Sequence, residues 1–505
     1  MISDKSNPNG LRFSYKRILY IVILSKMSPK KPYKLNKRDI KNKLGGEVIA
    51  SGGFGCVFKP ALACANGIRK SNGVSKLMTL KHANAEYDEI IQIKDKLNKI
   101  PNYLRYFLID DIDNLCIPAK LDDSDLRNFQ EKCSALKKDD YTVKNINASL
   151  NELRVLSMPD GGITLKEYIF KIRTLNQIQE LNISLIDLLE KGISPMNKRD
   201  IYHSDIKDTN ILVDATNDNL QPRLIDWGLT TEYPLEEQSR INDNNTHDLS
   251  WLPSKWKNKS IQFNVPFSII LFSSDFLNQY NAYLNTYGVP KPNNKKYIVE
   301  LDKFIATYLF YWMETGKGIG HIVTINKTIE ILYDLTKSSN EQTDIIVTDS
   351  NEPDESYKVY VYVKTIEIIT VYIRNILIKY THTKNAEPAI NDYVNNAFIN
   401  NIDKWGFVTT YLPFLKMASK DNLDKYNNEK VFNIIKDALL FLYETSDRAI
   451  TEKEITNRLN AINQLVGGTI TNRNNKKYNK QIGKNTCKPR IKLSNRKKTR
   501  TRKRK

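Results

Sequence analysis

The hydrophobic period of this chain changes from that of strands to that of a helix within its first hundred residues. Three short segments are rich in β-branched and aromatic side chains, namely EVIAS (47–51), GCVFKP (55–60) and GVSKLMTL (73–80). Turn residues separate them, at Gly52-Gly53 and in the polar stretch 66–73. Short runs of this composition between turns predict β-strands.

A helical pattern follows directly. From His82 to Lys99, side chains recur at spacings of three and four and share one face, and Pro101 closes the segment; the residues on that face are Ala83, Glu86, Ile90, Ile93 and Leu97. This spacing predicts a helix. Glu86 is unusual on an apolar face, because a buried carboxylate needs a partner.

Further along the chain, the polar composition of residues 121–149 predicts a surface insertion, and LRVLSMP (153–159) predicts another strand. The segments ILV (211–213) and RLIDW (223–227), separated by turn residues, predict a β-hairpin.

The rest of the chain is expected to be mostly helical from Gly161-Gly162 onward, with a mixed stretch at 235–400 that carries no chemical motif. Within it, residues 358–373 are expected to be buried as strand or helix, and their periodicity does not decide which.

Positive charge is concentrated at the C-terminal end. The 505 residues carry a formal charge of +20, but residues 472–505 contain 16 Lys or Arg and no acidic residue, which leaves 61 basic against 57 acidic residues elsewhere. The 40% hydrophobic content excludes a wholly disordered chain. We expect residues 471–505 to be a disordered basic tail that attracts nucleic acid or acidic proteins.

The five cysteines form no CxxC pair, and the five histidines share no metal-ligand spacing with them. The cysteines are therefore expected to be free thiols in a reducing compartment, and no zinc site is expected. The apolar segment 18–24 is too short to span a membrane and lacks a convincing cleavage site, so neither a membrane protein nor a secreted one is expected.

The first candidate site is a glycine-rich turn between two predicted strands. It comprises Ile49, Ala50, Ser51, Gly52, Gly53, Phe54, Gly55, Cys56 and Val57. Glycine is needed where backbone approaches phosphate oxygens closely. Lys76, on the next apolar strand, would need an anionic partner if buried, and Glu86 can supply it.

The second candidate site is the segment His203 to Val213, followed by LIDWG at 224–228. Asp205 could accept a hydroxyl proton, Lys207 could offset the charge of a transferred phosphoryl group, and Asn210 and Asp226 could ligate Mg²⁺ through oxygen. These residue types, in this order, indicate phosphoryl transfer.

Together these motifs resemble the eukaryotic-type protein kinase family, over residues 45–235. The stretch QFNVPFS (262–268) and the Asn-, Ile- and Lys-rich composition look most like the divergent kinases of giant cytoplasmic DNA viruses. The resemblance implies a two-lobed α+β fold, with a small β-rich N-lobe and a larger, mostly helical C-lobe with a long insertion.

The resemblance also implies roles for individual residues. The glycine-rich turn would cover the phosphates of ATP, and Lys76 would contact them and pair with Glu86, or with Glu89 as the alternative. Asp205 would be the catalytic base, Lys207 the phosphate-contacting lysine of the serine/threonine subclass, and Asn210 and Asp226 the Mg²⁺ ligands.

The implied domains are an N-terminal extension (1–44), an N-lobe (45–160), a C-lobe (161–470) with its insertion at 235–400, and the tail (471–505). The implied partners are protein substrates, and the implied location is intracellular, in a host cytoplasm or a virion.

Several residues depart from the family pattern. Ser204 replaces the arginine that binds an activation-loop phosphate, so control by such a phosphate is not expected, and Trp227 replaces the phenylalanine of DFG. The segment Asp403 to Gly406 resembles the start of the helix beneath the catalytic loop, but it lies unusually far from Asp226. Three alternatives remain: a pseudokinase scaffold, a phosphotransferase of the aminoglycoside or choline kinase kind, and a basic nucleic-acid-binding protein.

Overall fold

The computed structural model describes residues 46–65, 67, 73–109, 115–215, 220–234, 249–335, 355–383, 386–417 and 425–465. The chain divides into two compact units, residues 1–463 and 464–505. Only residues 464 and 465 of the second unit are described, so the predicted basic tail lies outside the described residues, as does the N-terminal extension. The elements that follow belong to the first unit, except that the last helix ends at Gln464, the first residue of the second unit.

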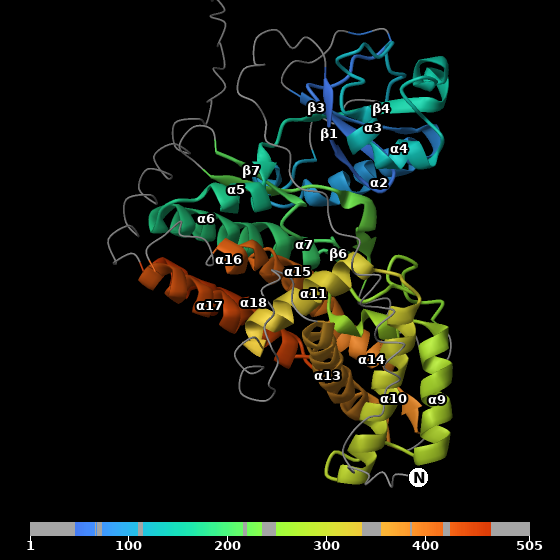
Figure 1. The fold of residues 1–505 in the computed structure, drawn as a ribbon, viewed down its shortest axis with the longest axis vertical. Helices are drawn as coiled ribbons and strands as arrows, with labels where there is room; N and C mark the ends of the chain where they lie inside the picture. Colours follow the sequence, from blue (N-terminus) through green and yellow to red (C-terminus); the bar gives the residue numbers. More distant parts are fainter. Residues whose placement is uncertain are drawn as a thin grey trace, which may run out of the picture. The chain divides into compact units, whose positions relative to one another are not determined.

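A four-stranded antiparallel sheet forms the N-terminal part of the fold (Figure 1). Its strands, in spatial order, are β1 (Glu47–Ser51), β2 (Gly55–Lys59), β3 (Gly73–Thr79) and β4 (Leu153–Pro159). The predicted strands are confirmed. β2 and β3 pair directly, and β4 joins the sheet only after about 70 residues of intervening chain.

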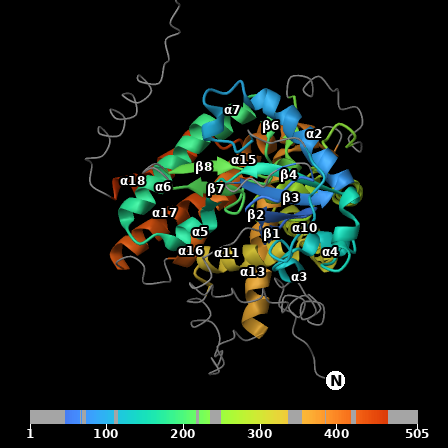
Figure 2. The ribbon, with the colours of Figure 1, turned by 90° about the horizontal axis from the view of Figure 1, so that it is seen from above.

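The predicted helix is α2 (Leu80–Leu97), which begins immediately after β3 and lies against β3 and β4 (Figure 2). Its buried face consists of Ala83, Ile90, Ile93 and Leu97. Lys94 and Lys96 occupy its last turn, where positive charge complements the helix dipole.

Residues 121–149 are packed against the sheet, so the prediction of a surface insertion is wrong. The short helices α3 (Phe129–Lys132) and α4 (Ser134–Lys138) bring Phe129 and Leu136 into one core with Val48, Phe58 and Leu77. Because each short element buries only one or two side chains, the segment is polar on average and shows no hydrophobic period.

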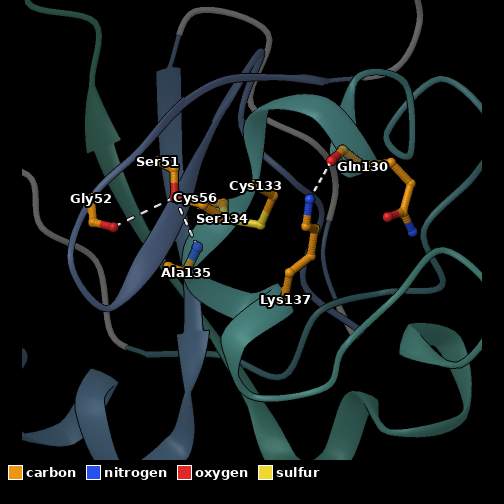
Figure 3. The surroundings of a disulfide bond; sticks show 8 residues. All are labelled: Ser51, Gly52, Cys56, Gln130, Cys133, Ser134, Ala135 and Lys137. Atoms are coloured by element: carbon orange, nitrogen blue, oxygen red, sulfur yellow. Dashed lines mark hydrogen bonds between the residues drawn. A yellow bond between two sulfur atoms is a disulfide. The ribbon is translucent and has the colours of Figure 1, made fainter. Parts of the chain in front are cut away.

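The expectation of free thiols is also wrong for the four described cysteines. Cys56 is bonded to Cys133, and Cys64 to Cys116, with Cα–Cα distances of 5.4 and 5.6 Å. The first bond joins β2 to the start of α4 (Figure 3). Because disulfides persist mainly in oxidising surroundings, these cysteines no longer support a reducing compartment. Cys487 lies outside the described residues.

The remainder of the unit is mostly helical, so the mixed α+β class is confirmed. It begins with β5 (Ile163–Thr164), α5 (Leu165–Lys171), α6 (Leu175–Leu188), η4 (Leu189–Ile193) and α7 (Ser194–Asn197). The predicted hairpin is confirmed as β7 (Ile211–Asp214) and β8 (Gln221–Leu224). On either side of it in the chain, β6 (Ile201–Tyr202) pairs with β9 (Thr231–Glu232).

The stretch 235–400 supplies most of the later helices. They are η7 (Phe267–Leu271), α9 (Ser274–Tyr287), α10 (Lys295–Glu314), α11 (Ile319–Leu332), α13 (Glu355–Lys379), α14 (Ile390–Tyr393) and η8 (Val394–Phe398), with a short pair of strands, β10 (Thr381–His382) and β11 (Glu387–Pro388). The ambiguous segment 358–373 is helical, within α13, which packs against α10 and α11. The Val, Ile and Tyr content of this segment favours strands. However, α13 as a whole has 25 residues, which exceeds the length of ordinary strands.

Four helices complete the described fold: α15 (Ile399–Thr409), α16 (Leu412–Met417), α17 (Lys425–Glu444) and α18 (Glu452–Gln464). None of the helices in the described ranges is long and apolar enough to cross a membrane.

The Cys64–Cys116 bond provides a direct test of this fold. We expect the double variant Cys64→Ser/Cys116→Ser to lower the free energy of unfolding by about 2–4 kcal/mol, because the bond restricts the unfolded chain. Urea denaturation under non-reducing conditions measures the difference. With excess dithiothreitol the variant and the original protein should unfold alike, and equal stability without reductant would contradict the disulfide.

Candidate active site

Lys76 and Glu86 form an ion pair between β3 and α2. The Nζ atom of Lys76 lies 2.7 and 2.6 Å from the two carboxylate oxygens of Glu86, and both side chains are mostly buried. Burial raises the pKa of Glu86, Lys76 opposes that rise, and the charge of Asp226 adds to it. The segment Trp227–Leu229, which directly follows Asp226, contacts α2. The predicted pairing of Lys76 with Glu86 is confirmed.

The sheet register places Val57 beside Lys76, and Lys76 beside Leu156 on β4. Because successive side chains of a strand point to opposite faces, Cys56 lies on the other face, fully buried in its disulfide. The side chain of Cys56 is thus separated from the face that carries Lys76.

The turn between β1 and β2 contains the predicted glycines. The N–H of Gly52 donates to the carbonyl of Gly55 (2.8 Å), and a Cβ at Gly52 would lie 3.9 Å from Cε of Lys76. A Cβ at Gly55 would lie 2.4 Å from Met78, so close strand packing requires glycine there. Gly53 borders open space.

The other turn residues are placed as follows. Phe54 is exposed and stacks on His82. Ile49 and Ala50 are also exposed, at a bulge in β1. The hydroxyl of Ser51 accepts a hydrogen bond from the N–H of Ala135 (3.0 Å; Figure 3). The turn is therefore attached to α4 through Ser51.

The loop between β6 and β7 carries three side chains that contact one another, those of Asp205, Lys207 and Asn210. The Oδ2 atom of Asp205 accepts from Lys207 Nζ (2.6 Å) and from Asn210 Nδ2 (2.9 Å). Its Oδ1 atom accepts from Asn264 Nδ2 (2.8 Å), and Asp205 is 7% exposed. The carboxylate is therefore held in one orientation by three side chains.

Asp403 on α15 supports this loop from beneath. Its carboxylate accepts from the N–H groups of His203 and Ser204, both at 2.8 Å, and from Asn197 Nδ2 at 2.7 Å. Burial raises the pKa of Asp403, and these donors together with the charge of His203 oppose the rise. The resemblance placed Asp403 at the start of the helix beneath the loop. Asp403 does support the loop, but it lies within α15, which begins at Ile399.

Asp226 follows β8 and stands in the left-handed region, with φ 66°. The N–H of Ile225 donates to the carbonyl of Asn210 (3.0 Å), and Nε2 of His203 donates to the carbonyl of Ile225 (3.0 Å). Trp227 is buried between Phe107 and His203. These contacts fix the backbone on which Asp226 stands next to the Asp205 loop.

The described ranges contain no group of three or more His, Cys, Asp or Glu side chains suited to a metal ion. Asn210 and Asp226 nevertheless fit Mg²⁺, which prefers oxygen ligands, takes one or two carboxylates from the protein and completes its shell with water and phosphate oxygens. The Mg²⁺ assignment of this pair stays a prediction.

Ser204, for which the resemblance would predict an arginine, makes a neutral contact. Its Oγ atom accepts from Nε1 of the buried Trp256 (3.0 Å). The adjacent Lys255 binds Glu89 on α2 (2.9 Å) and the carbonyl of Thr230 (3.0 Å). Glu89 is therefore paired with Lys255 and not with Lys76.

No protein-family model matches the chain, and a search of curated proteins finds no match to its sequence.

Sequence reasoning missed two contacts of this site. It named the segment that contains Asn264 but gave that residue no role, and it did not anticipate that Lys255 would bind Glu89. Neither contact could be found from local spacing, because Asn264 is 59 residues from Asp205 and Lys255 is 166 residues from Glu89.

Gly406 provides a test of how closely α15 approaches the loop. A Cβ at Gly406 would lie 2.7 Å from the carbonyl oxygen of Ile206 and 2.9 Å from its Cβ. We expect Gly406→Ala to lower the free energy of unfolding by about 1–3 kcal/mol through overpacking. Gly320→Ala on α11 is the matched control, because its Cβ would meet no atom within 4 Å.

Thermal and urea unfolding of both variants measure this difference. The control should keep its stability or gain about 0.4–1 kcal/mol. If Gly406→Ala is as stable as Gly320→Ala, the close approach of α15 to the loop is wrong.

Proposed function

We propose that this protein is an ATP-dependent protein kinase that transfers the γ-phosphate to serine or threonine hydroxyls. The observation that carries the proposal is the orientation of Asp205 by Lys207, Asn210 and Asn264, on a loop that the buried Asp403 holds in place. A general base must be fixed within hydrogen-bond reach of the proton that it takes.

The hydrogen bonds of Asp205 leave room for a substrate. An ionised carboxylate offers about four acceptor positions. Two on Oδ2 are used by Lys207 and Asn210, and one on Oδ1 is used by Asn264. The remaining position on Oδ1 suits a substrate hydroxyl, whose proton Asp205 would take as the oxygen attacks.

The remaining residues provide a binding site for the nucleotide. Bound Mg·ATP would supply the phosphoryl group and offset its negative charge. Lys76, fixed by Glu86, would contact phosphate oxygens beneath the Gly52–Gly55 turn, and Asn210 and Asp226 would hold Mg²⁺. The resemblance to protein kinases, together with Lys207 two residues after Asp205, favours serine or threonine substrates. All the residues proposed to bind the nucleotide, the metal and the transferred group are present, which argues against a pseudokinase.

Asp226→Ala tests the proposal. We expect it to lower phosphoryl transfer at least about a hundredfold, as removal of a group that stabilises charge in the transition state does. Transfer is measured with radiolabelled ATP and Mg²⁺, using mixed proteins in one arm and a panel of small-molecule alcohols in the other. Asp88→Ala, at an exposed position on α2, is the control and should retain full activity.

Each alternative predicts a different result. Phosphate on the small molecules alone would favour a small-molecule phosphotransferase, and no transfer by the unmodified protein would favour a pseudokinase. Normal turnover by Asp226→Ala would contradict the metal assignment.

A further inference from the structure

The two residues that flank the Gly52–Gly55 turn are both bonded to the start of α4. Ser51 ends β1, Cys56 lies in β2, and the register of the two strands places them opposite each other. Cys56 is joined to Cys133 by the disulfide. The hydroxyl of Ser51 accepts hydrogen bonds from Ser134 Oγ (3.2 Å) and from the N–H of Ala135 (3.0 Å; Figure 3). We call these three bonds the α4 tether.

The α4 end of the tether is itself held in the core. Cys133, Ala135 and Leu136 are buried in the same cluster as Leu77 of β3, and α4 contacts β2 directly. Closely packed side chains resist displacement. The position of α4 is therefore fixed relative to the sheet, and the tether fixes both ends of the turn relative to α4.

The disulfide lies on the face of the sheet away from Lys76. Val57 pairs with Lys76, whereas Cys56 pairs with Leu77, and successive residues of a strand point to opposite faces. Cys56 is fully buried, and its sulfur is 3.7 Å from Oγ of Ser51. The disulfide cannot touch a nucleotide bound next to Lys76, so any effect on such a nucleotide must pass through the backbone of the turn.

The middle of the turn is exposed. Gly53 borders open space, and the exposed ring of Phe54 stacks on His82. The N–H of Gly52 donates to the carbonyl of Gly55 (2.8 Å). Because glycine has more backbone conformations open to it than any other residue, a turn with this composition depends on its ends for order.

A turn that is ordered in advance binds a ligand more tightly, because ordering a loop during association opposes binding. Backbone N–H groups bind phosphate oxygens well only when several of them point to one place. With the tether, the turn is ordered when the protein folds, and little binding free energy is needed to order it.

We infer that α4 positions the Gly52–Gly55 turn for the phosphates of a nucleoside triphosphate, which makes Ser51, Cys56 and Cys133 positioning residues of the nucleotide site. The inference rests on the proposed kinase function. It also gives a role to residues 121–149, the segment whose composition predicted a surface insertion.

The nucleotide affinity of the full chain tests the inference. The variant Cys56→Ala/Cys133→Ala removes the covalent part of the tether, and binding of mant-ATP with Mg²⁺ is measured by fluorescence under non-reducing conditions. We expect the dissociation constant to rise at least about fivefold, because the turn must then be ordered during binding. In transfer assays KM for ATP should rise by a similar factor while kcat changes little, since the residues proposed to react are unchanged.

The matched control is Cys64→Ala/Cys116→Ala, which removes the other disulfide. The bonded cysteines are 77 and 52 residues apart in the two disulfides, and loops of these lengths differ little in entropy, so both variants should lose similar stability. Cys64 and Cys116 form backbone bridges with Pro118 and Val155 and not with the turn. The control should therefore bind mant-ATP as the original protein does.

Ser51 provides a second test that leaves the disulfide intact. Ser51→Ala removes the hydrogen bonds to Ser134 and Ala135 and should raise the dissociation constant of mant-ATP at least about twofold. Ser51→Thr keeps a hydroxyl and suits a strand, so it should retain the original affinity. This pair of variants decides the question if Cys56→Ala/Cys133→Ala does not fold, which circular dichroism melting checks.

The inference is overturned if folded Cys56→Ala/Cys133→Ala binds mant-ATP as tightly as Cys64→Ala/Cys116→Ala does. Equal affinities of Ser51→Ala and Ser51→Thr would also overturn it.

Hydrogen exchange separates failure of this inference from failure of the proposed function. If the original protein binds no mant-ATP, the kinase proposal fails, and exchange of the backbone amides of residues 52–56 decides whether α4 holds the turn. Exchange at least about threefold faster in Ser51→Ala than in Ser51→Thr, measured by mass spectrometry, would still support the tether. Equal exchange in these two variants would overturn it.

Discussion

The buried carboxylate of Asp403 is the interaction on which the candidate site depends. Removing a carboxylate from water costs several kcal/mol, and this cost is offset only when its oxygens are well bonded. The N–H groups of His203 and Ser204 and the amide of Asn197 provide those bonds. Ser204 has φ 61°, a left-handed conformation that costs an L-residue about 1–2 kcal/mol, so the bond to its N–H helps to hold the loop.

Hydrogen bonds, ring contacts and ion pairs fix the segments on both sides of the site. The backbone of Asn210 binds that of Ile225, and His203 contacts Trp227, so the chain around Asp226 is fixed relative to Asp205. The helix α2 is connected to both parts of the fold, through Glu86 to β3 and through Glu89 to Lys255. A third ion pair joins Lys96 of α2 to Glu232 on β9. A shift of α2 would therefore change the position of Glu86 and, with it, that of the Lys76 ammonium group.

The parts of this structure that could be predicted from sequence are those with a local pattern. The strands around Gly52, the helix that contains Glu86 and the hairpin after Asn210 each have a clear hydrophobic period or turn residues. The pair of Lys76 with Glu86 followed from the need to compensate buried charge.

Features that depend on distant contacts could not be predicted. Cys56 and Cys133 are 77 residues apart, and nothing near either one identifies its partner. The core contribution of Phe129 comes from a polar segment without periodicity.

The rate of phosphoryl transfer by Asp205→Asn tests the central claim most directly. The substitution keeps the shape of the side chain but removes the carboxylate that would take the hydroxyl proton. Single-turnover transfer from radiolabelled ATP should fall by a factor of about 10²–10⁴, the usual contribution of a general base, while fluorescent-nucleotide binding and the melting temperature stay close to those of the original protein. A transfer rate equal to that of the original protein would contradict the assignment of Asp205 as the base and remove the main support for a kinase.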